Sequence, residues 1–520
     1  MAVGSAYERT SKSLKNSQVA IVIQILSLIV GFISRKIFLD YLGTEVLGLN
    51  TTATSILNFL NIAELGISSA IAVTLYKPIY DGDRKTIREI VALQGWLYKR
   101  VAFFIIAASL VLVPFFPRIF SKMELPMWYA YASFGVLLFS SLLGYFVNYK
   151  QVMLAADQKD FKIQISYRLV MIAKVLCQIL AVRFLANPYV WWLILEALFA
   201  VVAALTLNWT IYRDYPYMRG KCAVDRELRL RYPDVITKVK QLFVHKIGSF
   251  AALQSLPIFI YAFTSLTVVA LYGNYMILFN SLQALLLALF TSITASVGNM
   301  IAEGDRGLIL KVFRELFASR FFLVVFCAYG MLFLSGPFVT LWLGPEYVLS
   351  GRTLWLMVIL FFLNNLRTVV DIFINAYGIF EDIWAPIAEA VIFVICAIIL
   401  GRLYGLDGVL MAQGIELILI VFIWKPFFLF THGMNRGAAS YFKLFFKLLA
   451  VSAAVFATGC YLASLIKIDA AAGIWPFLGY AAIICALFAL ILFAALYVAE
   501  SGIRTFVERI FRMSFRRRNG

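Results

Sequence analysis

Charged side chains inside long apolar segments are the residues of this sequence best placed to do chemistry. An ionised group at the centre of a membrane helix costs about 2.5–3.5 kcal/mol, so a charge in that position is a candidate for a function. Arg367 lies midway along one apolar segment, and Asp371 follows it four residues later. This spacing lets the two side chains pair on one face of a helix. Arg367 and Asp371 are therefore candidates for binding a substrate, and the alternative is a neutral pair that fixes two helices.

Three more basic residues occupy similar places. Lys174 is central to another apolar segment, with Gln178 one helical turn on, and it either binds an anion or pairs with a nearby glutamate. Arg35 and Lys36 lie near the end of the first apolar segment. Long basic side chains in that position either line a cavity or extend to the membrane interface. All three are candidates for contacting a substrate.

A polar stripe runs through the second apolar segment, with its members spaced by about three or four residues, as on one helix face. Lipid cannot satisfy these groups, so they face protein or a water-filled cavity. The stripe consists of Asn50, Thr51, Thr54, Asn58, Asn61, Glu64 and Ser68. Asn58, Asn61 and Glu64 are its candidates for substrate binding, and hydrogen bonds between helices are the alternative role.

Three acids are candidates for coupling transport to an ion. Glu196 and Glu416 stand 220 positions apart in similar apolar segments, and Glu389 lies in a third. A membrane interior favours the protonated or paired form of a carboxylate. Glu196 or Glu416 could therefore take up a proton during transport, and each could equally be the partner of a buried base.

Other kinds of site are not predicted. His245 and His432 are the only histidines and lie far apart, which leaves no metal cluster of the usual spacing. The sequence has no Gly-x-x-x-x-Gly-Lys-[Ser/Thr] loop for binding and hydrolysing ATP. The predicted external loops are too short for the catalytic carboxylates of a membrane glycosyltransferase or polymerase. We therefore expect no enzymatic activity, no metal and no cofactor.

The segments that hold these residues are predicted to be transmembrane helices. Hydrophobic residues make up 62% of the 520 residues and charged residues 14%, against roughly a quarter charged in a soluble domain. A bilayer requires about 20 apolar residues per helix. We expect an all-α integral membrane protein with about fourteen spans, at 17–38, 46–76, 95–116, 128–154, 163–185, 189–211, 241–264, 268–300, 312–336, 353–378, 384–402, 407–430, 442–465 and 475–499.

The basic residues predict the orientation of these spans. Of the 46 Lys and Arg, 36 fall on the side of the two termini, 8 on the other side, and Lys174 and Arg367 inside helices. The positive-inside rule then places both termini in the cytoplasm. Cys222 belongs to the longest cytoplasmic loop, where nine basic residues surround it. The topology also explains the net charge of +18 without any nucleic acid partner.

An internal repeat divides the chain. Asp81-Gly82-Asp83-Arg84 and Glu303-Gly304-Asp305-Arg306 are 222 residues apart, and the same offset relates Asp160 to Asp382. Since six helices is an even number, both halves enter the membrane from the same side, as a parallel repeat. The expected domains are a six-helix lobe at 1–212, a basic cytoplasmic linker at 213–240, a second six-helix lobe at 241–432, helices 13 and 14 at 433–500, and a basic amphipathic tail at 501–520.

Short motifs in the first two helices resemble a known family. They are GFISRKIF at 31–38, YLG at 41–43, LGL at 47–49, ELGI at 64–67 and LYKPI at 75–79. The sequence resembles the polysaccharide transporter family, the flippases for O-antigen and capsular repeat units within the multidrug and oligosaccharidyl-lipid exporter superfamily. Drug antiporters and peptidoglycan-precursor flippases share this fold, so the motifs are moderately specific.

The resemblance implies a function in surface polysaccharide biosynthesis. It implies two lobes that alternate between inward-open and outward-open states and move undecaprenyl-pyrophosphate oligosaccharide across the bacterial cytoplasmic membrane. Arg35 matches the position where related flippases keep a first-helix arginine in the cavity, and a basic cavity suits a pyrophosphate. The implied partners are the lipid-linked oligosaccharide, membrane lipids, and the polymerase and other proteins of polysaccharide assembly.

Two alternatives of the same fold stay open. One is a flippase for a teichoic, teichuronic or peptidoglycan precursor, and the other is a drug or cation antiporter. Drug antiporters of the superfamily usually stop at twelve helices. In the peptidoglycan-precursor relatives the last two helices form a groove for the lipid tail, so fourteen helices favour a lipid-linked cargo.

Overall fold

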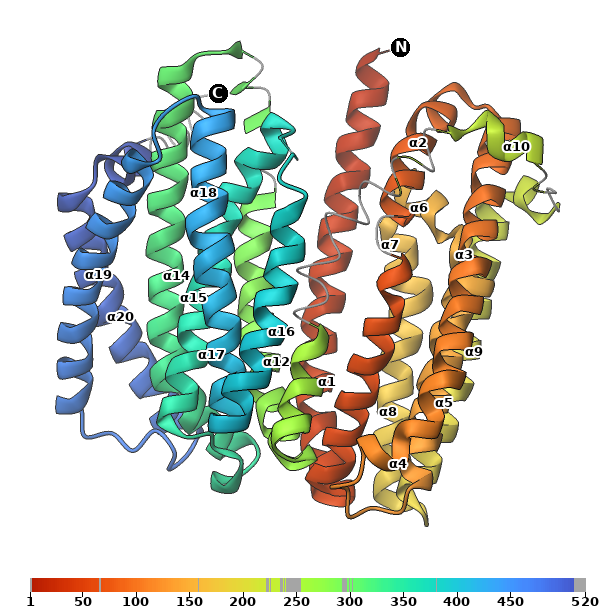
Figure 1. Ribbon diagram of the computed structural model, residues 1–520, viewed down its shortest axis with the longest axis horizontal. Coiled ribbons are helices and arrows are strands. Elements are labelled where there is room, and N and C mark those ends of the chain that lie inside the picture. The colour runs from red at the N-terminus through yellow and green to blue at the C-terminus, as the bar shows by residue number, and fades with distance from the viewer. Residues whose placement is uncertain are drawn as a thin grey trace. The chain divides into compact units, whose positions relative to one another are not determined.

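Helices make up nearly all of the described chain in the computed structural model, and the described residues contain no strand (Figure 1). The structure describes residues 2–64, 67–157, 159–220, 224, 226–233, 237, 239, 254–291, 297, 298, 300, 301, 303–379 and 381–508, and of 2–21, 63, 69, 226, 229, 288, 289 and 291 only the backbone. Cys222, most of the predicted seventh helix and the end of the predicted tail lie outside the described residues.

The chain divides into two compact units, Met1–Ala270 and Leu271–Gly520. The first contains α1 (Ala2–Leu60), η1 (Asn61–Glu64), α2 (Ile67–Asp81), α3 (Arg84–Leu112), η2 (Val113–Phe115), α4 (Phe116–Ile119), α5 (Trp128–Phe146), η3 (Asn148–Gln151), α6 (Val152–Ala156), α7 (Asp160–Ile163), η4 (Gln164–Arg168), α8 (Leu169–Phe184), α9 (Pro188–Asp214), η5 (Pro216–Arg219), α10 (Arg226–Arg231) and the apolar helix Gln254–Phe263.

The next helix, α12 (Leu266–Thr291), begins in the first unit and continues into the second. The remaining elements belong to the second unit. They are α14 (Arg306–Trp342), η6 (Pro345–Tyr347), α15 (Gly351–Tyr377), α16 (Trp384–Tyr404), α17 (Leu406–Glu416), η7 (Leu417–Trp424), α18 (Lys425–Phe428), η8 (Leu429–Gly433), α19 (Ala439–Leu465) and α20 (Ile474–Ala499).

Twelve helical stretches among the described residues are long and apolar enough to cross a membrane. They are Val22–Leu60, Arg84–Ile119, Trp128–Phe146, Asp160–Phe184, Pro188–Asp214, Leu266–Leu287, Arg306–Trp342, Gly351–Tyr377, Trp384–Tyr404, Leu406–Gly433, Ala439–Leu465 and Ile474–Ala499. The chain is a multi-pass membrane protein, as its composition predicts. The described part of the predicted seventh helix is the shorter apolar helix Gln254–Phe263.

The first two predicted helices differ most from the structure. Helix α1 continues through the predicted loop and is broken only at Gly43, whose φ of 82° suits a residue without a Cβ. The second predicted helix, 46–76, is wrong as a single element. It is interrupted by the 3₁₀ turn η1, and the chain resumes as α2.

The repeated glycine and aspartate pairs form the same turn in both units. Gly82 and Gly304 have φ of 70° and 79°, and the aspartate after each one caps the following helix. Asp83 accepts hydrogen bonds from the first amides of α3, and Asp305 does so for α14. The Thr86 hydroxyl and backbone amide hold the pKa of Asp83 below its usual range. With these caps, α3 begins at Arg84 and α14 at Arg306, earlier than the predicted helix starts at residues 95 and 312.

In the second unit, α19 and α20 lie against α14 (Figure 1). Tyr329 of α14 stacks on Phe488 of α20 with 3.8 Å between ring centroids, and its hydroxyl donates to the Gly459 carbonyl of α19 at 2.9 Å. A Cβ at Gly459 would lie 2.7 Å from Phe488 and 2.9 Å from Tyr329. The absence of a side chain at Gly459 is therefore what lets the three helices approach.

Glu500 adds a charged contact just after α20. Its buried carboxylate accepts hydrogen bonds from Arg314 of α14 at 2.8 Å and from Lys447 of α19 at 3.0 Å. Burial acts to raise the pKa of Glu500, but these two cationic partners outweigh it and hold the pKa below its ordinary value. The last two helices are thus fixed to α14 by both stacking and charge.

Candidate transport site

Glu64 is held by tyrosine hydroxyls. Tyr98 of α3 and Tyr145 of α5 donate hydrogen bonds to its two carboxylate oxygens at 2.6 and 2.9 Å. The Ser68 hydroxyl lies against that of Tyr98. Among the described residues no lysine or arginine forms an ion pair with Glu64. The 3₁₀ turn η1 holds this acid where two neighbouring helices supply its hydrogen bonds.

The three asparagines of the polar stripe also make contacts between segments, whereas Thr51 and Thr54 donate to carbonyls of their own helix. Asn58 donates to the Gln254 side chain at 3.1 Å, and Ser141 of α5 donates to Asn61 at 3.4 Å. Asn50 accepts hydrogen bonds from hydroxyls on α5 and α9 at 2.5 and 3.2 Å. The structure therefore gives each of these asparagines a hydrogen bond to another segment, the alternative role that the sequence leaves open.

Arg35 and Lys36 lie on the first part of α1. Arg35 is half-buried, and its Nη2 lies 3.4 Å from the carbonyl oxygen of Ala270, whereas Lys36 is exposed. Further along α1, Gly48 packs so closely on the backbone of Leu266 that a Cβ would collide with it. The first turn of α12, from Leu266 to Ala270, thus packs along the same helix that carries both basic residues.

Lys174 and Glu196 form an ion pair between α8 and α9. Lys174 Nζ lies 2.7 and 2.9 Å from the two oxygens of Glu196, and Gln178 donates a third hydrogen bond to this carboxylate at 3.1 Å. Both charged side chains are largely buried, with 14% and 11% exposed. The structure thus pairs a predicted anion-binding residue with a predicted ion-coupling residue, and one charge neutralises the other.

Four charged residues of the second unit form a cluster in which acids outnumber bases. Arg367 Nε lies 3.0 Å from Asp371 Oδ2, the pairing that their spacing predicts. Arg367 Nη1 lies 3.8 Å from Glu389 Oε1 on α16. Glu416, at the end of α17, interacts electrostatically with both Arg367 and Glu389. Residues from three helices, separated by up to 49 positions, thus meet at one place inside the unit.

The cluster has one cation and three acids. Glu389 and Glu416 are 3% and 2% exposed, so water does not stabilise their charges. If all four groups ionise, the arginine neutralises one carboxylate and two negative charges remain. Like charges at close range disfavour that state. Among the described residues the acids thus outnumber the bases, and this distinguishes the cluster from the one-to-one pair of Lys174 and Glu196.

Arg320 is a buried charge that the sequence pattern does not single out, since it counts only as one of the 36 basic residues on the side of the termini. It lies in α14 and is 1% exposed. Its guanidinium donates to the carbonyl oxygens of Leu286 and Asn365 at 2.6 and 3.0 Å and to the side chains of Asn365 and Thr368 at 3.1 and 3.2 Å. The cap at Asp305 is the signal that could locate it, because 15 residues of helix advance about 22 Å.

Comparison with known proteins yields solved structures alone, since no protein-family model and no curated protein matches the sequence. The lipid II flippase MurJ in an inward closed conformation superposes with a TM-score of 0.62 over 92% of this chain and 99% of its own, at 15% identity. An inward-facing MATE multidrug transporter of the MOP superfamily gives 0.60 over 79% and 96%, at 12% identity. A mutant of the Vibrio cholerae MATE transporter VcmN gives 0.52 over 82% and 99%, at 11% identity.

The chain has the fold of MOP transporters.

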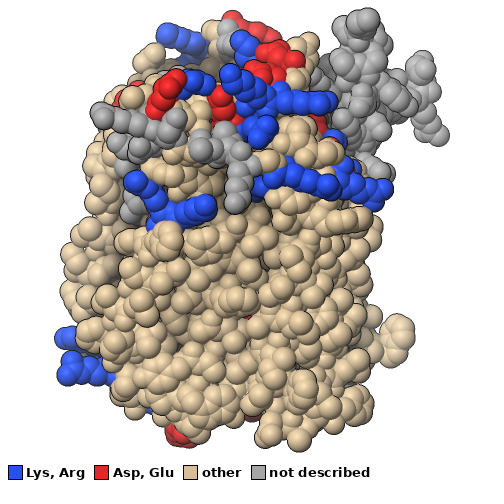
Figure 2. Space-filling view, turned by 90° about the vertical axis from the view of Figure 1, so that its right-hand side faces the viewer, with Lys and Arg blue, Asp and Glu red and all other residues tan. Residues whose placement is uncertain are grey.

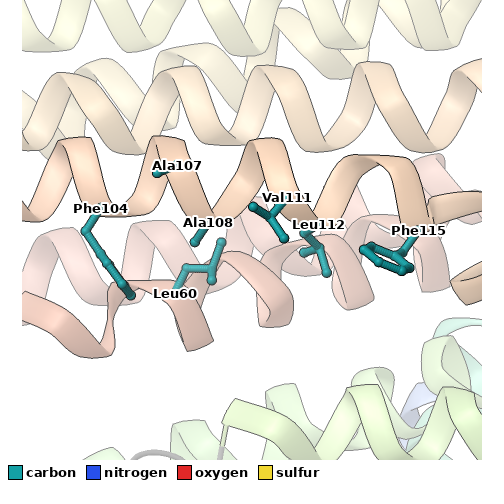
Figure 3. A pocket seen from close by; sticks show the side chains of 7 residues that line it. All are labelled: Leu60, Phe104, Ala107, Ala108, Val111, Leu112 and Phe115. Atoms are coloured by element: carbon teal, nitrogen blue, oxygen red, sulfur yellow. The ribbon is translucent and has the colours of Figure 1, made fainter.

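An apolar pocket lies between the end of α1 and α3, but it is not a site for charged groups (Figure 3). Its volume is about 430 Å³, and its lining consists of Leu60, Phe104, Ala107, Ala108, Val111, Leu112 and Phe115. These side chains carry no donor or acceptor, so the pocket suits hydrocarbon. Within the described parts of the chain, no group of three His, Cys, Asp or Glu is arranged to hold a metal ion.

Proposed function

We propose that this protein is a flippase that moves undecaprenyl-pyrophosphate-linked oligosaccharide repeat units across a bacterial cytoplasmic membrane for surface polysaccharide synthesis. One observation supports a lipid-linked cargo over a drug. The similarity to the lipid II flippase covers 92% of this chain, whereas the similarity to the inward-facing MATE transporter covers 79%. A flippase is expected to cover more of this chain than a MATE transporter does if α19 and α20 are helices that contact a lipid-linked cargo.

Arg35 and Lys36 are the proposed contacts for the pyrophosphate. Both lie on the first part of α1, one half-buried and the other exposed. Arginine binds phosphate oxygens through two parallel hydrogen bonds, which suits a diphosphate. Lys174 and Arg367 each lie beside a carboxylate and are not part of this proposal.

The cluster of Arg367, Asp371, Glu389 and Glu416 is the proposed coupling site. Acids outnumber bases in the cluster among the described residues, and proton uptake would change which charges α15, α16 and α17 present to one another. A group that binds an ion more tightly in one conformation shifts the population towards that conformation. The cluster can therefore drive an alternating-access cycle without any nucleotide.

The distribution of basic residues supports the proposed orientation, and the proposed cargo determines the proposed partners. We place both termini in the cytoplasm because the basic residues gather on that side. The proposed partners are the lipid-linked oligosaccharide, the surrounding lipids, and the polymerase and other proteins that use the exported repeat unit.

The test is transport by the purified protein in liposomes. A fluorescent undecaprenyl-pyrophosphate oligosaccharide is placed in both leaflets, and dithionite, which does not cross the bilayer, quenches the outer half. Flipping makes the protected half accessible, so quenching should go beyond one half in proteoliposomes and stop at one half in protein-free liposomes. A stop at one half in both, with folded protein, would refute the function.

A drug or cation antiporter is the second candidate, favoured by the TM-score of 0.60 with the MATE transporter. The same proteoliposomes distinguish it. An antiporter would release a loaded cationic dye under an ion gradient and leave the lipid-linked sugar in place.

A further inference from the structure

A basic pocket in the first unit is separate from all the residues considered above. It lies at one end of the unit, between α3, η3, α9 and η5, and has a volume of about 820 Å³. Four basic residues, Arg88, Lys99, Lys150 and Arg219, are part of its lining, and none of its lining residues is an acid. The lining of the pocket is therefore positively charged and suits an anion.

The charges of the pocket are not neutralised by carboxylates within the described part of the chain. Lys150 donates to the Tyr212 hydroxyl at 2.6 Å and to a backbone carbonyl at 3.2 Å, both of which are neutral groups. Nearby acids have other partners. Glu89 accepts from Arg231 at 3.1 Å, and Asp214 pairs with Lys162. Among the described residues, the basic side chains of the pocket thus have no carboxylate partner.

Two buried polar atoms of the lining have no partner among the described residues. They are Nε of Arg88, a donor, and Oδ1 of Asn208, an acceptor. Buried polar groups are normally hydrogen-bonded, so each one points to a missing ligand group. The donor suits a phosphate oxygen, and the acceptor suits a hydroxyl.

The pocket lies where charged and aromatic side chains of the first unit meet. Figure 2, which faces the side of the molecule formed by α3, α9 and α10, shows Lys and Arg together with Asp and Glu at one end of a wide apolar surface. Trp96, Tyr149 and Tyr212 line the pocket, and such aromatic side chains are typical of the membrane interface. Gly95 allows the Tyr149 ring to lie against α3, since a Cβ there would be 2.7 Å from it.

We propose that this pocket binds the headgroup of an anionic phospholipid that carries both a phosphate and hydroxyl groups, as phosphatidylglycerol does. The basic side chains hold the phosphate, Asn208 accepts from a headgroup hydroxyl, and the acyl chains lie along the apolar surface below. Basic pockets between membrane helices on the cytoplasmic side are known to bind acidic headgroups. The site does not depend on which cargo the protein carries.

The test titrates short-chain phosphatidylglycerol into purified protein in a neutral detergent and follows binding by native mass spectrometry and thermal shift. The variant pair Arg88→Gln with Lys99→Gln should weaken binding by on the order of tenfold or more. The matched control, Lys77→Gln with Lys85→Gln, removes the same charge from two exposed residues of the same unit and should bind like the wild type. Should the first pair fail to fold, Arg219→Gln alone, at an exposed position of the lining, replaces it.

Two comparison ligands identify the source of the phosphate. Phosphatidylcholine of the same chain length should bind at least tenfold more weakly, and glycerol phosphate should give little stabilisation. Equal binding of phosphatidylglycerol by the pocket pair and the control pair, or equal binding of phosphatidylcholine, would overturn the site. Glycerol phosphate that binds as tightly as the lipid would identify a soluble phosphate ester and overturn the lipid assignment.

Discussion

Lys174 and Glu196 neutralise each other inside the first unit, with 2.7 Å between Nζ and Oε1. Removing one member of such a buried pair costs about 3–5 kcal/mol, whereas replacing both by apolar residues is often neutral. We expect Lys174→Met to lower the unfolding temperature in detergent strongly and Lys174→Met with Glu196→Leu to restore it. Lys77→Met, at an exposed lysine of the same unit, is the control for loss of a positive charge.

Transport by the double variant tests the role of this pair. If the pair is structural, the restored protein should flip cargo at the wild-type rate. A stable double variant that does not transport would assign Lys174 and Glu196 to the transport site.

Loss of one acid from the cluster of Arg367, Asp371, Glu389 and Glu416 should affect transport more than stability. Glu416→Gln keeps the shape of the side chain but removes an ionisable group, so transport driven by an ion gradient should fall to the rate without a gradient. The unfolding temperature should change little, because one acid less improves the charge balance with Arg367. Glu346→Gln, at an exposed acid of the second unit, is the control. Full gradient-driven transport by Glu416→Gln would show that Glu416 does not couple.

Arg367 gives a second test of the same cluster. Arg367→Ala removes the cation that lies beside Asp371 and Glu389, so both stability and transport should be lost. Restoration of export by Arg367→Ala with Asp371→Ala would make the two residues a structural pair and would move any coupling to Glu389 and Glu416.

The tyrosines around Glu64 predict a change in stability. Tyr98→Phe removes the hydroxyl that donates to Glu64 at 2.6 Å. A hydrogen bond to a charged group is worth about 1.5–3 kcal/mol, so we expect a clear fall in the free energy of unfolding. Tyr131→Phe removes a hydroxyl from a ring that stacks on Phe116 in the same unit. Equal losses from the two changes would mean that the contact with Glu64 adds nothing.

Glu500 predicts a dependence of stability on pH. Its pKa is below the ordinary value in the folded protein, so its contribution is complete above the unfolded pKa of about 4.3 and is lost as the pH falls through the folded pKa. The unfolding temperature of the wild type should exceed that of Glu500→Gln by a constant margin between pH 7 and pH 5, and this margin should shrink in stronger acid. Glu508→Gln, at an exposed acid, should show no such margin. A margin independent of pH would rule out a role for the charge.

Orientation can be tested at Cys222, which lies in the predicted cytoplasmic loop. A variant that keeps this cysteine alone should react with a membrane-impermeant maleimide only after spheroplasts are lysed. Labelling of intact spheroplasts would reverse the topology.

Local patterns predicted the helices and several of their ends, because both depend on short stretches of sequence. Apolar runs located the spans, and the Gly-Asp pairs at Asp83 and Asp305 marked caps that the predicted starts did not use. The pair of Arg367 and Asp371 was predictable for the same reason, since four residues make one helical turn.

Contacts between helices were not predictable in this way. Glu64 meets tyrosines 34 and 81 positions away, and these distances depend on how the helices pack. Arg320 is the extreme case, because half of its hydrogen bonds go to backbone carbonyls. Every residue type has a backbone carbonyl, so no sequence pattern predicts which one will accept a hydrogen bond from Arg320.

The contact of Glu500 with Arg314 and Lys447 also sets an order of events during biosynthesis. Both basic residues leave the ribosome before their shared carboxylate, Arg314 by 186 positions. Until Glu500 is made, neither can find this partner, and α19 has no ionic tie to α14. A chain that ends in the last helix therefore lacks the carboxylate that binds Arg314 and Lys447 in the finished protein.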